Sequence, residues 1–309
     1  MKILVTGKNG LVGNAIKKVC LSDEFSNLEV DFAGRDECNL LSRDKIDKLL
    51  DLTRPDAIIH TAARVGGIGM NLSTPVEQYY ENIIMNTELI NSAHKHGVNN
   101  IICFSSVCAF PSGLDILEEK MLHAGEPYPA HRSYAYSKRM VDIQIETHRN
   151  QHGLNYCSVI PGNIFGKNDN FNLENGHVIP SLIHKCYLSK RSKKEFEVWG
   201  NGEPMREFIY SEDIARACLH LIQKKDMPQR IIMSGRKEHK IKDIVDIICN
   251  RFEYHNVKWL IDKPNGQMRR PSKKKIFDKH LPGFEFTDIE KSLGDTISWF
   301  ESTYPEVRK

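Results

Sequence analysis

The first half of the chain alternates short apolar runs with longer segments that carry apolar residues at helical spacing. The apolar runs indicate buried strands at residues 2–7, 28–35, 56–63, 100–106 and 155–163. The helical spacing is clearest at residues 75–97, where it stops at Gly97, a frequent end of a helix. Strands that alternate with helices in this way predict a mostly parallel sheet with helices on both faces.

This alternation ends after the fifth predicted strand. An Asn-, Gly- and Asp-rich segment follows at residues 162–177 and is long enough to form a functional loop. Beyond it, helical patterns mix with short strands up to a helical pattern around 287–303. We therefore expect an α/β protein with a doubly wound parallel sheet in residues 1–165. A smaller C-terminal α/β lobe, mainly 166–309, would bind substrate, and segments near 205–222 would return to the first domain.

The composition excludes several classes of protein but does not indicate a function. The net charge of +3, from 43 basic and 40 acidic residues, gives no general attraction to nucleic acid or to membranes. No apolar run approaches the ~18 residues of a spanning helix, and the N-terminus lacks the features of a signal peptide. Eight cysteines occur without a Cys-x-x-Cys pair, so neither a zinc site nor a disulfide framework is expected. We expect a cytoplasmic protein without a bound metal.

A glycine-rich segment joins the first predicted strand to the first predicted helix. The sequence "TGKNGLVG" places Gly7, Gly10 and Gly13 there. The first glycine permits a tight turn, the second lets the backbone approach a pyrophosphate, and the third allows close packing of helix and strand. The N-terminus of the helix offers free N–H groups to the phosphates. This context distinguishes the segment from an ordinary turn and predicts a Rossmann-type dinucleotide-binding domain.

The end of the second strand bears on the choice of cofactor. An acidic residue there would bind the ribose 2′-hydroxyl of NAD, but the sequence "AGRDE" places Arg35 in that position. A guanidinium suits a 2′-phosphate, so NADP is favoured over NAD. The neighbouring Asp36 is the counter-argument, and NAD stays open as the alternative.

A tyrosine and a lysine lie four residues apart in "RSYAYSKRMVD", residues 132–142. On a helix, Tyr134 and Lys138 share one face, whereas Tyr136 points about 160° away from Tyr134. Such a pair is common by chance. Here it follows a strand that ends near Ser106, at the edge of the sheet where ligands bind. The ammonium of Lys138 would lower the pKa of the phenol, Tyr134 would protonate a carbonyl oxygen, and Ser106 would hydrogen-bond the same oxygen.

With these residues the chain resembles the extended short-chain dehydrogenase/reductase family. The segments "AARVGGIGMN", "SSVCAFP", "PGNIFGKNDNFNLENGHVIPSLI" and "VWGNGEPMREFIYSEDIARA" extend the likeness over most of residues 1–220. They are similar to the NADPH-dependent enzymes that epimerise C3 and C5 of GDP-4-keto-6-deoxy-D-mannose and reduce its C4 ketone. The specific part of the resemblance pairs "SxCxFP" with "DNFxxxxxHVIP".

The resemblance implies roles that spacing alone does not assign. Cys108 would be the base that removes a proton beside the C4 ketone, and His177 the acid that returns one. Taken alone, Cys108 fits a small buried hydrophobe better than a base, and His177 fits a loop or helix-cap residue equally well. The implied cofactor contacts are Gly7, Asn9, Gly10, Leu11, Val12, Gly13, Arg35, Asn39, Leu40, Ala62, Ala63, Ser105, Lys138, Pro161, Asn163, Ile164 and His177. The implied substrate contacts are Lys185, Trp199, Arg206, Asn265 and Arg270.

The chain departs from the family pattern at three of these positions. Asn9 replaces an arginine that assists the 2′-phosphate in some relatives, which leaves Arg35 more isolated. Lys185 stands where some relatives have arginine, and Asn265 where the pattern often has aspartate.

The resemblance also implies a homodimer, in which the helices at 76–97 and 133–152 pack against their symmetry mates. One alternative is a different nucleotide-sugar 4-keto epimerase/reductase, for example one with a colitose-like product. A remote alternative is a non-catalytic NADP-binding regulator. The intact set of Ser106, Tyr134 and Lys138 argues against that regulator.

Overall fold

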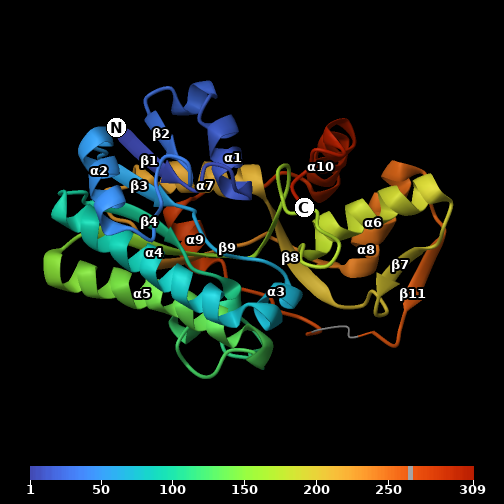
Figure 1. The fold of residues 1–309 in the computed structure, drawn as a ribbon. Helices are drawn as coiled ribbons and strands as arrows, with labels where there is room; N and C mark the ends of the chain where they lie inside the picture. The colour runs from blue at the N-terminus through green and yellow to red at the C-terminus, as the bar shows by residue number, and fades with distance from the viewer. Residues whose placement is uncertain (264–266) are drawn as a thin grey trace.

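The computed structural model describes residues 1–263 and 267–309, which form two lobes (Figure 1). The larger lobe is built on a six-stranded sheet of order β2-β1-β3-β4-β5-β9 in which every pairing is parallel. Its strands are β1 (Lys2–Thr6), β2 (Glu29–Ala33), β3 (Ala57–His60), β4 (Asn100–Phe104), β5 (Asn155–Pro161) and β9 (Arg230–Met233). The predicted doubly wound parallel sheet is thereby confirmed. The strand order reverses between β1 and β3, which creates a crevice beside the loop after β1.

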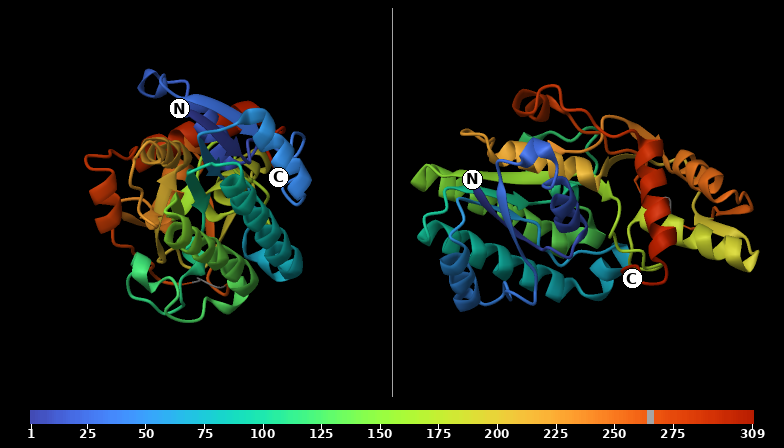
Figure 2. Two further views of the ribbon diagram at one scale, coloured as in Figure 1. Left: turned by 90° about the vertical axis from the view of Figure 1, so that its left-hand side faces the viewer. Right: turned by 90° about the horizontal axis from the view of Figure 1, so that it is seen from above.

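Helices cover both faces of this sheet (Figures 1 and 2). The alternation of side chains along β1 shows why: Ile3 and Val5 belong to one hydrophobic core and Leu4 to the other. The first core is covered by α1 (Leu11–Val19) and α7 (Ser211–Ile222), which pack against each other. The second is covered by α2 (Arg43–Thr53), α4 (Pro75–Lys95) and α5 (Arg132–His152). Helices α4 and α5 lie side by side.

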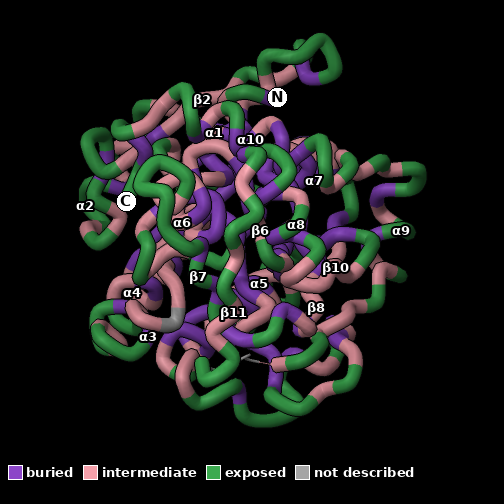
Figure 3. Tube along the Cα trace, turned by 90° about the vertical axis from the view of Figure 1, so that its right-hand side faces the viewer, coloured by how far each residue is buried: buried purple, intermediate pink, exposed green. Residues whose placement is uncertain are grey.

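The smaller lobe has its own core of aromatic and aliphatic side chains. It contains a three-stranded sheet of β6 (Asn163–Phe165), β8 (Met205–Tyr210) and β10 (Glu238–Lys240), and a pair of β7 (Phe196–Trp199) and β11 (Val257–Leu260). Its helices are α6 (Val178–Ser192), α8 (Ile241–Phe252) and α10 (Ile289–Thr303). Seen from this side, buried residues occupy the middle of the trace and exposed ones the outer loops (Figure 3).

Several elements beyond residue 165 belong with the larger lobe. Strand β9 pairs with β5, and α7 and α9 (Lys275–His280) contribute to the core under β1. The chain therefore passes between the lobes more than once. We keep the division near residue 165 as a proposal, with these elements as its return segments. None of the helices in residues 1–263 and 267–309 is both long and apolar enough to cross a membrane.

Candidate active site

The loop after β1 has the close contacts that its glycines permit. Gly7 has φ +81°, and a Cβ there would lie 2.7 Å from the backbone nitrogen of Ala62. A Cβ on Gly13 would lie 2.2 Å from the carbonyl oxygen of Gly7, so only glycine lets α1 approach the loop. Gly10 is the N-cap of α1 and supplies no side-chain hydrogen bond. The first N–H groups of α1 are thus available to an anion, and the cradle fits a dinucleotide pyrophosphate.

Most of the residues predicted to contact the cofactor follow strands of the larger sheet. Because the strands are parallel, their carboxyl ends share one edge. The loop after β1 carries Gly7, Asn9, Gly10, Leu11, Val12 and Gly13. The loops after β2 and β3 carry Arg35, Asn39, Leu40, Ala62 and Ala63; Ser105 follows β4, and Pro161 ends β5. The other four lie elsewhere: Asn163 and Ile164 on β6, Lys138 on α5, and His177 at the N-cap of α6. Their contacts with a cofactor stay a prediction.

A second cation that sequence reasoning missed lies at the end of β2. The ammonium of Lys8 pairs with the carboxylate of Glu37, which also accepts a hydrogen bond from the Gly34 N–H at 2.8 Å. The Lys8 side chain lies over Gly34, beside Arg35, which is exposed. The loop that contains Asn9 therefore carries a cationic side chain one residue earlier, paired with Glu37. The available signal was the lysine inside the glycine loop.

Ser106, Cys108 and Tyr134 come together at the carboxyl end of β4. The hydroxyl of Ser106 accepts a hydrogen bond from the Cys108 N–H at 3.1 Å and caps the short 3₁₀ helix Val107–Ala109. The Ser106 hydroxyl also lies close enough to the phenol of Tyr134 to lower its pKa. Lys138, one turn along α5, lies with its Nζ 5.9 Å from the centre of the Tyr134 ring. One serine thus connects the tyrosine of the predicted reduction to the cysteine of the predicted epimerisation.

Burial controls the electrostatics of this cluster. It raises the pKa of the Tyr134 phenol, and the nearby Cys108 raises that pKa further, while Ser106 lowers it. Burial lowers the pKa of Lys138 to about 8. Tyr136 takes no part, because its hydroxyl donates to a carboxylate oxygen of Glu126 at 2.7 Å.

His177 lies at the other end of the long loop, as the N-cap of α6. Its side chain is 46% exposed, and its Nδ1 is 3.9 Å from the buried carboxylate of Asp169. Desolvation acts to lower the pKa of His177, but the nearby carboxylate of Asp169 outweighs it and raises the pKa. In the described residues, the interactions of His177 run to Asp169 and Arg308 rather than to Cys108. Sequence reasoning missed Asp169, although it opens the quoted motif "DNF".

Two of the predicted substrate residues, Arg206 and Arg270, converge on Cys108. Both guanidinium groups interact electrostatically with its thiol. Arg270 donates to the carbonyl of Val107 at 3.0 Å, and Arg206 to the carbonyl of Met205 at 2.7 Å. Burial lowers the pKa of both arginines. Neither forms an ion pair with any residue that the structure describes, which suits them to a phosphate ligand.

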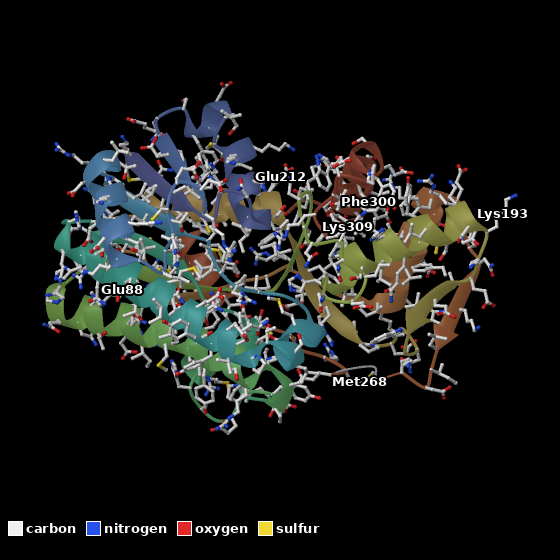
Figure 4. All side chains as sticks on the ribbon, viewed as in Figure 1. Glu88, Lys193, Glu212, Met268, Phe300 and Lys309 are labelled. Carbon is white, nitrogen blue, oxygen red and sulfur yellow. The ribbon has the colours of Figure 1, made fainter. Side chains whose placement is uncertain are left out.

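The remaining substrate candidates lie on the smaller lobe. The ammonium groups of Lys185 and Lys263 lie 5.2 and 5.8 Å from the ring centre of Trp199, which is 57% exposed. Lys185 and Trp199 line a pocket that extends to Lys193, at the tip of the lobe (Figure 4). The pocket is separate from the cluster around Ser106. Asn265, the last candidate, falls outside the described residues.

A dinucleotide cradle beside a serine, tyrosine and lysine set defines the class: a Rossmann-type enzyme of nucleotide-dependent redox chemistry. Residues 3–234 match the NAD dependent epimerase/dehydratase family, and the chain belongs to this family. It is 33% identical to the GDP-L-fucose synthase of Dictyostelium discoideum, over 99% of this chain and 97% of that protein. It is 32% identical to the GDP-L-colitose synthase of Yersinia pseudotuberculosis, over 97% and 98%. The crystal structure of a GDP-L-fucose synthetase from Naegleria fowleri bound to NADP superposes with a TM-score of 0.91 at 31% identity, over 100% and 96%.

The depressed pKa of Lys138 predicts a pH-dependent contribution to stability. Between about pH 8 and 10.5 the unfolded chain keeps the lysine proton that the folded protein has lost, so unfolding binds a proton. The free energy of unfolding of the wild type, relative to Lys138→Met, should therefore rise by up to about 1.4 kcal/mol per pH unit in this range. Urea denaturation at several pH values measures it. Removal of an exposed lysine in Lys95→Met should leave the pH dependence unchanged, and a flat difference for Lys138→Met would contradict the prediction.

Proposed function

We propose that this chain is a GDP-L-fucose synthase. It converts GDP-4-keto-6-deoxy-D-mannose to GDP-L-fucose by epimerisation at C3 and C5 and NADPH-dependent reduction at C4. The observation that carries the proposal is the position of Ser106, which accepts a hydrogen bond from the Cys108 backbone and lies near enough to the Tyr134 phenol to lower its pKa. A candidate base and a candidate proton donor for the reduced oxygen thus share one site. The names of the relatives, each matched over nearly its whole length, support the same reaction.

The C4 ketone acidifies the protons on C3 and C5, so epimerisation requires a base on one face of the sugar and an acid on the other. Cys108 removes the proton as a thiolate, and His177 returns a proton to the opposite face. Arg206 and Arg270 bind the diphosphate of the substrate, because their side chains are half-buried and form no ion pair with a carboxylate among the residues that the structure describes. Lys185 and Trp199 contact the nucleotide end.

The reduction uses the residues around Lys138. NADPH, when bound, supplies the hydride for C4. Tyr134 donates its phenolic proton to the C4 oxygen, and Ser106 hydrogen-bonds the same oxygen. The charge of Lys138 stabilises the phenolate that forms, and its side chain binds the ribose of the nicotinamide. Lys8 and Arg35 hold the 2′-phosphate, and the first N–H groups of α1 hold the pyrophosphate.

Replacement of Cys108 by serine separates the two half-reactions. The wild type should oxidise NADPH in the presence of GDP-4-keto-6-deoxy-D-mannose and incorporate solvent deuterium at C3 and C5. Cys108→Ser should lose at least about 99% of this incorporation, because the serine hydroxyl is far less acidic than a thiol and supplies almost no anionic base at neutral pH. Mass spectrometry measures the deuterium incorporated, and NMR of the product shows at which carbons it lies. Cys20→Ser, at the end of α1, is the matched control and should behave as the wild type.

The products distinguish the proposal from its rivals. A wild type that leaves NADPH unoxidised would refute the reductase. Oxidation with an unepimerised sugar would refute the roles of Cys108 and His177. The 32% identity to a GDP-L-colitose synthase makes a colitose-type reaction the second candidate. Conversion of a 3-deoxy substrate in preference to GDP-4-keto-6-deoxy-D-mannose would favour it.

The two cations at the end of β2 should determine the preference for NADPH. A charge-assisted hydrogen bond contributes about 1.5–3 kcal/mol, so Lys8→Ala and Arg35→Ala should each raise the KM for NADPH by about tenfold or more. The KM for NADH should change little, since NADH has no 2′-phosphate. Steady-state kinetics with both cofactors test this, with Arg43→Ala on α2 as a control. An equal loss with both cofactors would contradict the assignment.

We also propose a homodimer formed through α4 and α5. These helices present apolar side chains to solvent, among them Val76 (72% exposed), Tyr80 and Ile143. A second copy of this surface would remove them from water. Charged substitutions in a Tyr80→Glu/Ile143→Glu variant should therefore yield a monomer in light scattering. Leu52→Glu, at a more exposed apolar position on α2, should remain dimeric. A monomeric wild type would refute the dimer.

A further inference from the structure

The loop between β6 and α6 buries a carboxylate that the proposed mechanism does not yet use. Asp169 is 3% exposed. Its Oδ1 accepts a hydrogen bond from the Asn170 N–H at 2.7 Å. Its Oδ2 is buried and has no hydrogen-bond partner in the part of the chain that the structure describes. A buried carboxylate with a free oxygen is costly unless a cation lies beside it. The imidazole of His177, 3.9 Å from Oδ1, is its ion-pair partner.

The loop fixes both ends of this pair. Phe171, two residues after Asp169, is fully buried, and the centre of its ring lies 4.8 Å from the centre of the Phe300 ring. The side chain of Asn172 accepts hydrogen bonds from the backbone N–H groups that precede His177. The carbonyl of His177 accepts the first hydrogen bond of α6, from Ser181 at 3.1 Å. The separation of Asp169 and His177 is therefore set by a tightly turned backbone rather than by two free side chains.

The position of His177 makes a counter-charge necessary. As the N-cap of α6 it lies at the positive end of the helix dipole, which disfavours an imidazolium. The positive charge of Arg308 opposes protonation as well. Asp169 is the acidic group that faces the ring, and the pKa of His177 is raised in spite of desolvation. A proton donor at this position depends on that single carboxylate.

We propose that Asp169 is the positioning residue of the His177 acid: it binds the Nδ1–H and thereby presents a protonated Nε2 to the sugar. The inference rests on the proposed function, in which His177 returns a proton to carbon. The proton leaves Nε2 and forms the new C–H bond. The imidazole is then neutral, and its Nδ1 keeps its proton, which still faces the carboxylate of Asp169. Cys108 has meanwhile taken the proton of the broken C–H bond, so one proton is removed and one returned.

The variant Asp169→Asn tests the proposal, because it keeps the shape of the side chain and removes its charge. Titration of the His177 ring by NMR, in the protein without substrate, should shift to lower pH by about one unit. The signal is assigned by its absence in His177→Asn. The high-pH limb of the deuterium-exchange profile should shift by the same amount, with kcat lowered about tenfold above this limb and KM for the sugar unchanged. Glu174→Gln, which removes an exposed acid in the same loop, should match the wild type.

The outcomes are distinct. An unshifted His177 titration in Asp169→Asn, whether or not activity falls, would overturn the proposal and leave Asp169 a structural residue. Asp169→Glu keeps the charge, so its titration should lie nearer to the wild type, and it serves as the second variant if Asp169→Asn does not fold. A wild type without epimerase activity would refute the proposed function, whereas the NMR titration would still decide whether Asp169 controls the protonation of His177.

Discussion

The ammonium of Lys138 is 2% exposed and donates a hydrogen bond to the carbonyl of Phe104 at 3.0 Å. A buried cation is expensive, so the protein must satisfy it at one defined place, the carboxyl end of β4. A second link runs in the opposite direction, from the Ser105 hydroxyl to the carbonyl of Lys138 at 3.0 Å. Together these bonds fix the rotation of α5 against β4. Tyr134 lies one turn earlier on the same face of α5. The bonds that orient the helix therefore also place its phenol near Ser106.

A second buried charge joins the lobes in a similar way. The ammonium of Lys274 donates to Glu207 Oε2 at 2.7 Å and to the hydroxyl of Ser234 at 2.6 Å. Glu207 lies on β8 of the smaller lobe, and Ser234 follows β9 of the larger sheet. Arg206 directly precedes Glu207 in the sequence, and Arg270 lies shortly before Lys274. The contact between the lobes thus helps to set where the two guanidinium groups lie, and the proposed binding of the substrate diphosphate would depend on it.

The sequence predicted what depends on local periodicity. The helix expected at 75–97 is Pro75–Lys95, and the angle between helical positions separated Tyr134 from Tyr136 correctly. Strand β9 was not placed in the larger sheet, because its pairing with β5 joins segments far apart in sequence and leaves no local signal. Asp169 and Lys8 were missed for a related reason. In the sequence of a polar loop, a charged residue that will be buried or paired looks the same as one that is exposed to solvent. Only the fold distinguishes the two.

The shared site constrains the order of the proposed chemistry. An anion on Cys108 raises the pKa of Tyr134, so a thiolate and a phenolate oppose each other in the same buried cluster. In the proposed mechanism, proton abstraction from the sugar would convert Cys108 to the neutral thiol. That change removes the opposing charge just where Tyr134 must become a phenolate as the C4 oxygen is protonated. Lys138 can then balance a single negative charge rather than two. Epimerisation before reduction is therefore the order that the electrostatics of this cluster favour.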